Sequence, residues 1–275
     1  MNSFNAGKFA SQHEFRGGVK IEIIGENIPV QYNMPTWYRL IENDCCLDVY
    51  AFIRHSDRML ILGQDALLEG RTELPYFYRS KWHVNFECSV ITFNDPSLYD
   101  EKGRTCGWWQ KPGAMELSHR FIRLITKKLA ISENKLVFYG ASAGGYYTLA
   151  SASEFSQSII IADIPQVDLE TAPYQEKISY LKSFYGNIYD VFYWWGKERV
   201  NIREINYLQN KKDTKHIRTQ LSAFLNGIHK ISTTGEININ NISIRLYENK
   251  AEARGHSPME VDSLILLLRE KIESL

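Results

Sequence analysis

The segment of residues 135–152, KLVFYGASAGGYYTLASA, constrains the fold more than any other part of the chain. The apolar run from Leu136 to Tyr139 predicts a buried strand, and the small residues that follow predict the start of a helix. Ser142 lies between them in G-A-S-A-G, the spacing of a serine held on a tight strand-to-helix turn. Glycines are needed in such a turn because the strand and helix backbones approach closely. An ordinary glycine-rich turn fits the same residues, so the segment alone leaves both interpretations open.

The rest of the chain continues this alternation of strand and helix. The expected strands are 19–24, 47–53, 58–63, 88–95, 135–140, 158–163, 205–210 and 242–249. From the fourth strand onward each is followed by a helical pattern, which predicts an α/β fold with a mainly parallel sheet of about eight strands flanked by helices. We expect the first three strands to form an antiparallel start of this sheet. We also expect one helix to end near Gly227 and the last helix to bury Val261, Leu264, Ile265 and Leu268.

Length and composition favour one domain over the whole of residues 1–275, with a helical, aromatic-rich cap inserted at about 166–204. The 32 basic and 32 acidic residues balance, which argues against nucleic acid as the main partner. No stretch is apolar and long enough to span a membrane, and none near the start resembles a signal peptide. The four cysteines lack metal-type spacing, so we expect free thiols, no bound metal and a cytoplasmic protein.

A serine nucleophile on such a turn needs an acid and then a histidine later in the chain. His256 lies in the loop between the last strand and the last helix, where a general base would face Ser142. The preferred acid is Asp213, which follows the strand at 205–210 and would orient the imidazole. It could equally serve as a helix N-cap. The other candidate acids are, in order, Asp163, then Asp168 and Glu248.

An acyl-transfer site also needs two N–H donors for the oxyanion. The first expected donor is the Ala143 N–H, at the positive end of the helix that follows the serine. The second should come from the loop after the third strand, LGQDALLEG, where Gln64 is preferred. Gly63 and Asp65 remain alternatives.

Taken together, these residues resemble the α/β-hydrolase superfamily over nearly the whole chain. Within it, the sequence is most similar to bacterial capsular and surface polysaccharide O-acetyltransferases. The shared motifs are YGASAGG, DIPQVDL, NKKDTKH, GHSP and FNDPSLY followed by GWW. The resemblance implies that Ser142 carries an acyl group, that acetyl-CoA is the donor and that a polysaccharide is the acceptor.

Four further residues are candidates for substrate binding. Trp194 and Trp195 lie in the aromatic insertion and Trp109 in GWW, and their flat rings would suit sugars or an acyl donor. Gln166 belongs to the DIPQ motif. For the tryptophans, packing in a helical core is the competing interpretation. Two other functions stay open: a carbohydrate esterase or deacetylase, in which water replaces the sugar hydroxyl, and a non-catalytic glycan-pathway protein. The acceptor sugar and the oligomeric state do not follow from the sequence.

Overall fold

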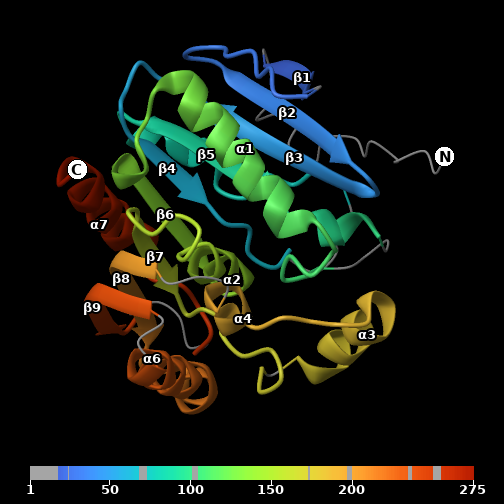
Figure 1. The fold of residues 1–275 in the computed structure, drawn as a ribbon. Coiled ribbons are helices and arrows are strands. Elements are labelled where there is room, and N and C mark those ends of the chain that lie inside the picture. Colours follow the sequence, from blue (N-terminus) through green and yellow to red (C-terminus); the bar gives the residue numbers. More distant parts are fainter. Residues whose placement is uncertain are drawn as a thin grey trace.

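The computed structural model describes residues 18–23, 25–67, 73–100, 105–172, 174–196, 200–234, 237–249 and 255–275. Within these ranges the chain forms one nine-stranded sheet in the order β1-β2-β3-β5-β4-β6-β7-β8-β9 (Figure 1). The strands are β1 Val19–Ile23, β2 Pro35–Glu42, β3 Cys45–Phe52, β4 Met59–Leu62, β5 Ser89–Asn94, β6 Leu136–Ala141, β7 Ile159–Asp163, β8 Val200–Asn210 and β9 Ile237–Tyr247.

The sheet corrects three expectations about its first half. It has nine strands in the described residues rather than about eight, because β2 was not predicted. β1 pairs with β2 in parallel, so the start of the sheet is not wholly antiparallel. β4 lies between β5 and β6 and is parallel to both, and only the β2–β3 and β3–β5 pairs are antiparallel.

A buried ion pair explains why β2 was not predicted from the sequence. Arg39 stands in the middle of the strand and is 5% exposed, which interrupts the apolar pattern expected of a buried strand. In the sheet it lies opposite Asp48 of β3 and binds that carboxylate through Nε at 2.7 Å and Nη2 at 2.8 Å. A buried charge is tolerated when it is paired in this way, and the partner becomes apparent only once the two strands are aligned.

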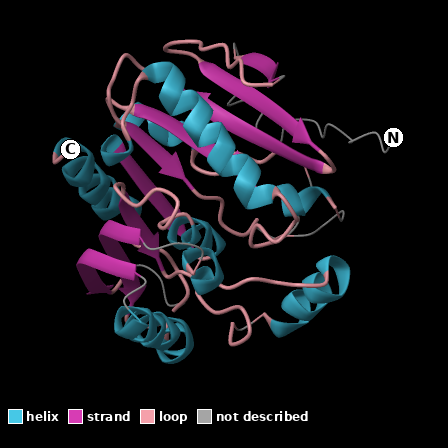
Figure 2. Ribbon diagram, in the orientation of Figure 1, coloured by secondary structure: helices cyan, strands magenta, loops and turns pink. Residues whose placement is uncertain are grey.

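Helices cover both faces of the sheet (Figure 2). They are α1 Ala114–Leu129, α2 Ala143–Ala150, α3 Gln175–Tyr185, α4 Val191–Trp195, α5 Thr214–His216, α6 Ser222–Thr234 and α7 Val261–Glu273, with 3₁₀ turns at Ser80–Asn85, Pro96–Tyr99 and Glu133–Lys135 and a π turn at Ile217–Leu221. Helices α1, α2, α4 and α6 pack on one face of the sheet, and α7 packs on the other. The central strands β3 to β7 are buried along their whole length, as expected where helices cover both faces of a sheet.

Two expectations about helices are wrong in detail. The helix expected to stop near Gly227 continues to Thr234. A Cβ at Gly227 would lie 2.0 Å from a ring atom of Phe192, so this glycine makes room for a packed ring rather than ending the helix. In α7, Leu264 and Leu268 are buried as expected, but Val261 is 54% exposed.

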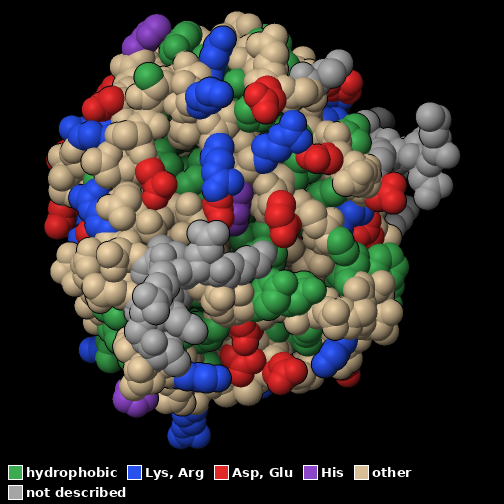
Figure 3. Space-filling model, viewed as in Figure 1, with side chains coloured by type: hydrophobic (Ala, Val, Ile, Leu, Met, Phe, Trp, Pro, Cys, Tyr) green, Lys and Arg blue, Asp and Glu red, His purple; other side chains and the backbone are tan. Residues whose placement is uncertain are grey.

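The surface and the thiols fit the composition. Figure 3 shows acidic and basic side chains interspersed on the face it presents, in keeping with a formal net charge of zero. All four cysteines are free thiols, and the structure shows in addition that all four are buried. Among the described residues, no helix is both long enough and apolar enough to cross a membrane.

Candidate active site

Ser142 lies on the turn between β6 and α2 with φ 53° and ψ −114°, a conformation that non-glycine residues seldom adopt. Its N–H donates to the Asp163 carbonyl at 3.0 Å, which ties the turn to β7. A Cβ at Gly140 would lie 2.1 Å from the Gly144 carbonyl oxygen, so only glycine permits this approach of strand and helix. The turn therefore has the strained geometry expected of a nucleophile-bearing serine.

His256 approaches the serine from the loop before α7. Its Nε2 lies 3.0 Å from the Ser142 Oγ. Gly255 lets the loop pack directly on the neighbouring one, since a Cβ there would lie 2.5 Å from the Lys212 carbonyl oxygen. Residues 250–254, in the stretch that leads to this loop, lie outside the described residues. The histidine is thus in hydrogen-bond contact with the serine hydroxyl, as a general base must be.

Asp213 follows β8 and is the N-cap of α5. Its Oδ2 lies 2.7 Å from the His256 Nδ1, and the residue is 5% exposed. Although burial acts to raise its pKa, hydrogen bonds from His216 and His256 hold that pKa well below the usual range. The carboxylate therefore stays ionised and can only accept hydrogen bonds. Both predicted roles, helix cap and partner of the histidine, coexist in this residue.

The other candidate acids are engaged elsewhere. Asp163 is fully buried and accepts from the Tyr247 hydroxyl at 2.7 Å and from the Met259 N–H at 2.8 Å. Burial raises the pKa of Asp163 to about 7. Asp168 accepts from a backbone N–H and a hydroxyl of its own turn. Glu248 is exposed and pairs with a lysine at 3.4 Å.

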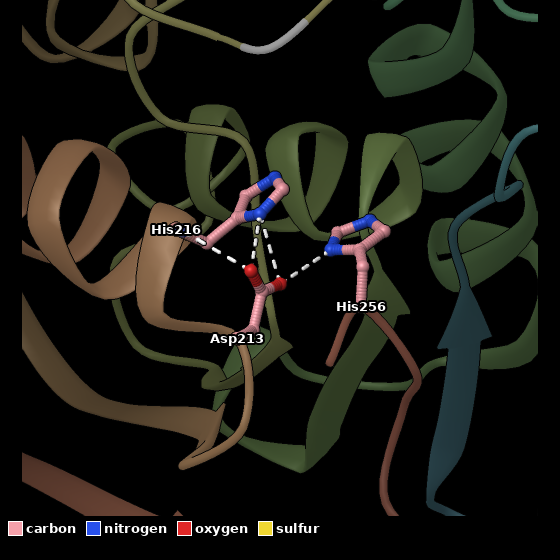
Figure 4. Close-up of side chains that lie close together, drawn as sticks. All are labelled: Asp213, His216 and His256. Atoms are coloured by element: carbon pink, nitrogen blue, oxygen red, sulfur yellow. Dashed lines mark hydrogen bonds and ion pairs between the residues drawn. The ribbon is translucent and has the colours of Figure 1, made fainter. Parts of the chain in front are cut away.

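His216 also binds the Asp213 carboxylate, which sequence reasoning did not foresee (Figure 4). Its Nδ1 lies 2.9 Å from Oδ1 and 2.8 Å from Oδ2, and its backbone N–H donates to Oδ1 at 3.2 Å. Its ring stacks on His256 with centroids 4.1 Å apart. The signal lay in the D-x-x-H spacing, because an N-cap aspartate and the residue three positions later are neighbours on the first helical turn.

Asp213, His216 and His256 also form, among the described residues, a group of possible metal ligands whose atoms lie within 4.8 Å of one another. The two Nδ1 atoms are 2.7 and 2.9 Å from the carboxylate oxygens. A tetrahedral zinc ion between nitrogen and oxygen would hold them about 3.3 Å apart. The distances are those of direct hydrogen bonds, and we interpret the group as hydrogen-bonded side chains.

The expected oxyanion donors come from the start of α2 and from the loop after β4. Ala143 is the first residue of α2, where a backbone N–H has no acceptor within the helix. The Gly63 N–H donates to the Tyr139 carbonyl at 2.8 Å and is therefore occupied. This leaves Gln64 and Asp65 as alternatives for the second donor. The Gln64 side chain is itself buried and accepts from the Asp95 N–H, which holds its loop in place.

A buried ion pair joins this loop to the nucleophile strand, and it too was not predicted. The Asp65 carboxylate accepts from the Ala141 N–H at 3.1 Å and from the Arg79 guanidinium at 2.5 Å. The Arg79 side chain is 6% exposed, so the pair is largely removed from water. These contacts tie the loop after β4 to β6, the strand that leads to Ser142.

Two of the tryptophans expected to bind substrate belong to the core. Trp109 is 1% exposed and stacks on Tyr147 at 4.3 Å. Trp195 is fully buried, and its indole N–H donates to the Leu149 carbonyl at 2.6 Å. With no exposed ring face, neither can contact a sugar, and packing explains both.

The other two candidates contact Ser142 itself and the helix that follows it. The Gln166 N–H donates to the Ser142 carbonyl at 3.3 Å, but its side chain is buried and accepts from the Trp108 indole. Trp194 is half-buried and donates to the Tyr146 hydroxyl at 2.9 Å. Of the four, Trp194 is the one with exposed ring surface.

Comparison with solved structures gives the class of the fold: the chain has an α/β-hydrolase fold, as the sequence motifs implied. It resembles the capsule O-acetyltransferase of Neisseria meningitidis serogroup A with a TM-score of 0.60 and 16% identity over 84% of this chain and 92% of the other. Another structure of that enzyme contains CoA and has a TM-score of 0.61 at 13% identity, covering 84% and 93%. Acetyl xylan esterase 1 of Thermoanaerobacterium sp. matches with a TM-score of 0.52 and 12% identity over 83% and 79%. No family model and no curated protein sequence matches the chain.

Proposed function

We propose that this protein is a serine-dependent acyltransferase that O-acetylates a bacterial capsular or surface polysaccharide with acetyl-CoA as donor. The observation that carries the proposal is the continuous hydrogen-bonded chain from the Ser142 Oγ through His256 to Asp213, with separations of 3.0 and 2.7 Å. Such a chain on a strained turn is the arrangement that activates a serine for acyl transfer.

In the first half-reaction the Ser142 Oγ attacks the thioester carbonyl of acetyl-CoA while His256 Nε2 accepts the hydroxyl proton. The carbonyl oxygen becomes an oxyanion, which the N–H groups of Ala143 and Gln64 would stabilise. Asp213 holds the imidazolium through its Nδ1–H. Collapse of the intermediate breaks the carbon–sulfur bond, and the departing thiolate takes the proton from Nε2. The acetyl group is left as an ester on the serine.

In the second half-reaction a sugar hydroxyl attacks this ester and gives its proton to His256 Nε2. The new carbon–oxygen bond forms to the sugar, and the serine leaves with the proton restored to its Oγ. The half-buried ring of Trp194 is our candidate for contact with the sugar. The likeness to a capsule O-acetyltransferase, one structure of which holds CoA, supports both the donor and the polysaccharide acceptor.

A hydrolase is the second candidate, since the fold is also that of acetyl xylan esterases. Water would then replace the sugar hydroxyl in the second half-reaction, with the same residues in the same roles. Incubation with radiolabelled acetyl-CoA, with and without bacterial polysaccharides, separates the two. Label transferred to polysaccharide supports the transferase. Release of acetate at the same rate with every polysaccharide, with no labelled glycan, would establish the hydrolase instead.

Replacement of Ser142 tests whether the site is catalytic at all. We expect Ser142→Ala to abolish acetyl transfer and labelling by a fluorophosphonate probe, because no other group carries the acyl intermediate. Ser153→Ala is the matched control: this serine follows the same helix and donates only to the Trp194 carbonyl at 3.0 Å. A native protein that does not react with the probe, or a Ser142→Ala variant that still does, would favour a non-catalytic glycan-pathway protein.

A further inference from the structure

The second histidine on the Asp213 carboxylate is more than the serine site requires. A triad needs one imidazole on its acid, and His256 supplies that contact through Oδ2 at 2.7 Å. His216 contacts the same carboxylate, with its Nδ1 2.9 Å from Oδ1 and 2.8 Å from Oδ2. It is 2% exposed, whereas the side chain of His256 is 25% exposed. One imidazole therefore reaches toward the serine and the other is enclosed.

We propose that His216 is a positioning residue, a neutral imidazole that locks the Asp213 carboxylate and supports the ring of His256 so that its Nε2 stays directed at Ser142. The inference rests on the proposed function only in naming that reaction. The arrangement itself rests on three contacts to one carboxylate and one stacked pair of rings.

The hydrogen bonds determine the protonation state of His216. An ionised carboxylate can only accept, so the Nδ1 of His216 must be the protonated nitrogen. Its Nε2 is buried and has no hydrogen-bond partner among the described residues, which suits a bare lone pair better than a second N–H. Burial also holds the pKa of His216 below its ordinary value. The residue is thus a neutral donor rather than a second cation.

The position of His216 limits the motion of both its neighbours. Its Nδ1 lies 2.9 Å from Oδ1 and 2.8 Å from Oδ2, and its backbone N–H donates to Oδ1, so a rotation of the carboxylate would break these contacts as well as the contact of Oδ2 with His256. The imidazole planes of the two histidines are inclined by only 18° with centroids 4.1 Å apart, so one face of His256 is covered. When His256 gains a proton, the neutral aromatic face beneath it is a favourable surface for the cation.

Two variants separate the hydrogen bond from the stacked ring. His216→Phe keeps a ring in the stack but removes the donor to Asp213. His216→Asn places an amide N–H close to the former Nδ1 and keeps the donor without the ring. We expect His216→Phe to lower kcat for acetyl transfer by about 100-fold with little change in KM, because a small misalignment of reacting groups has that effect. His216→Asn should recover most of this loss. His119→Phe is the matched control, a buried histidine that contacts Ser151 at 3.0 Å.

A readout independent of turnover is the low-field proton resonance of the His256 Nδ1–H, assigned by its loss in His256→Ala. We expect it to persist in native protein, His216→Asn and His119→Phe, and to broaden or vanish in His216→Phe. Native kcat together with the native resonance in His216→Phe would overturn the proposal. So would equal loss of kcat in both variants with the resonance unchanged. If His216→Phe does not fold, His216→Ala replaces it, and persistence of the resonance there overturns the proposal equally.

The two proposals fail in different ways. If the native protein does not transfer acetyl groups but its His256 resonance still depends on His216, the proposed acyltransferase function is refuted and the positioning role is retained. If the native protein transfers acetyl groups but its kcat and the His256 resonance are unchanged by replacement of His216, only the positioning role is refuted.

Discussion

Asp213 and Asp163 follow or end neighbouring parallel strands, yet their surroundings give the two carboxyl groups opposite properties. Asp213 receives hydrogen bonds from two imidazoles, which hold its pKa well below the usual range. Asp163 is enclosed beneath the loop of His256, and burial raises its pKa to about 7. Only the first can remain a charged partner of an imidazolium under all ordinary conditions.

Isosteric amides test this difference at the level of single residues. We expect Asp213→Asn to lower kcat by about 10³- to 10⁴-fold, because an amide no longer specifies the tautomer of His256. Asp163→Asn should keep most of the activity, since an amide can still accept from the Met259 N–H. Steady-state kinetics on both variants provides the measurement. The opposite order of effects would identify Asp163 as the acid.

Among the elements, the short helix α4 is held on α2 by two tryptophans, of which Trp195 is the more deeply buried. Trp195 is fully buried, donates to the Leu149 carbonyl and packs against Phe224 at 6.3 Å between ring centroids. Tyr193, two residues earlier on the same helix, is 46% exposed. The aromatic residues of the insertion thus divide into a buried anchor and an exposed face.

Truncation at these two positions should have unequal effects. We expect Trp195→Ala to lower the free energy of unfolding by about 3–5 kcal/mol, because it removes a large buried side chain and leaves a cavity. Tyr193→Ala, the control on the same helix, should change it far less. Urea unfolding followed by circular dichroism measures both. Similar losses for the two variants would mean that Trp195 does not anchor the helix.

For the molecule as a whole, Asp163 makes stability depend on pH. The folded protein keeps this proton up to about pH 7, whereas the ordinary value is 3.8. The native state therefore binds more protons between these values, and stability from this group is lost as the pH rises from about 4 to about 7. Since each pKa unit corresponds to about 1.4 kcal/mol, the upper bound is about 4 kcal/mol.

Asp163→Asn should remove this contribution, because an amide does not titrate. We expect the free energy of unfolding of the native protein, relative to that of the variant, to fall between about pH 4.5 and about pH 8, two test conditions that cover most of this range. Urea titrations at the two pH values give the comparison. Curves that stay parallel would show that the carboxyl group is already ionised at the lower pH.

Local sequence patterns were sufficient to predict most strands of the sheet and three residues of the candidate site. Ser142, Asp213 and His256 each follow an apolar run that reads as a strand, and parallel strands bring their carboxyl ends to one edge of the sheet. The tight turn that carries Ser142 was also predictable, because an apolar strand followed directly by G-A-S-A-G fits few other local structures. The expected termination at Gly227 failed because the space required by Phe192 of α4 cannot be seen in the helix that contains the glycine.

Neighbouring residues and their periodicity were sufficient to predict the α/β alternation, the position of the serine turn and the order of serine, acid and histidine along the chain. The ninth strand, the core positions of Trp109 and Trp195, and the second imidazole on Asp213 became apparent only in the folded structure. These depend on pairs such as Arg39 with Asp48, or His216 with His256, that become neighbours when the chain folds. Once buried, such pairs make ionic and stacking contacts that cannot be inferred from either segment alone.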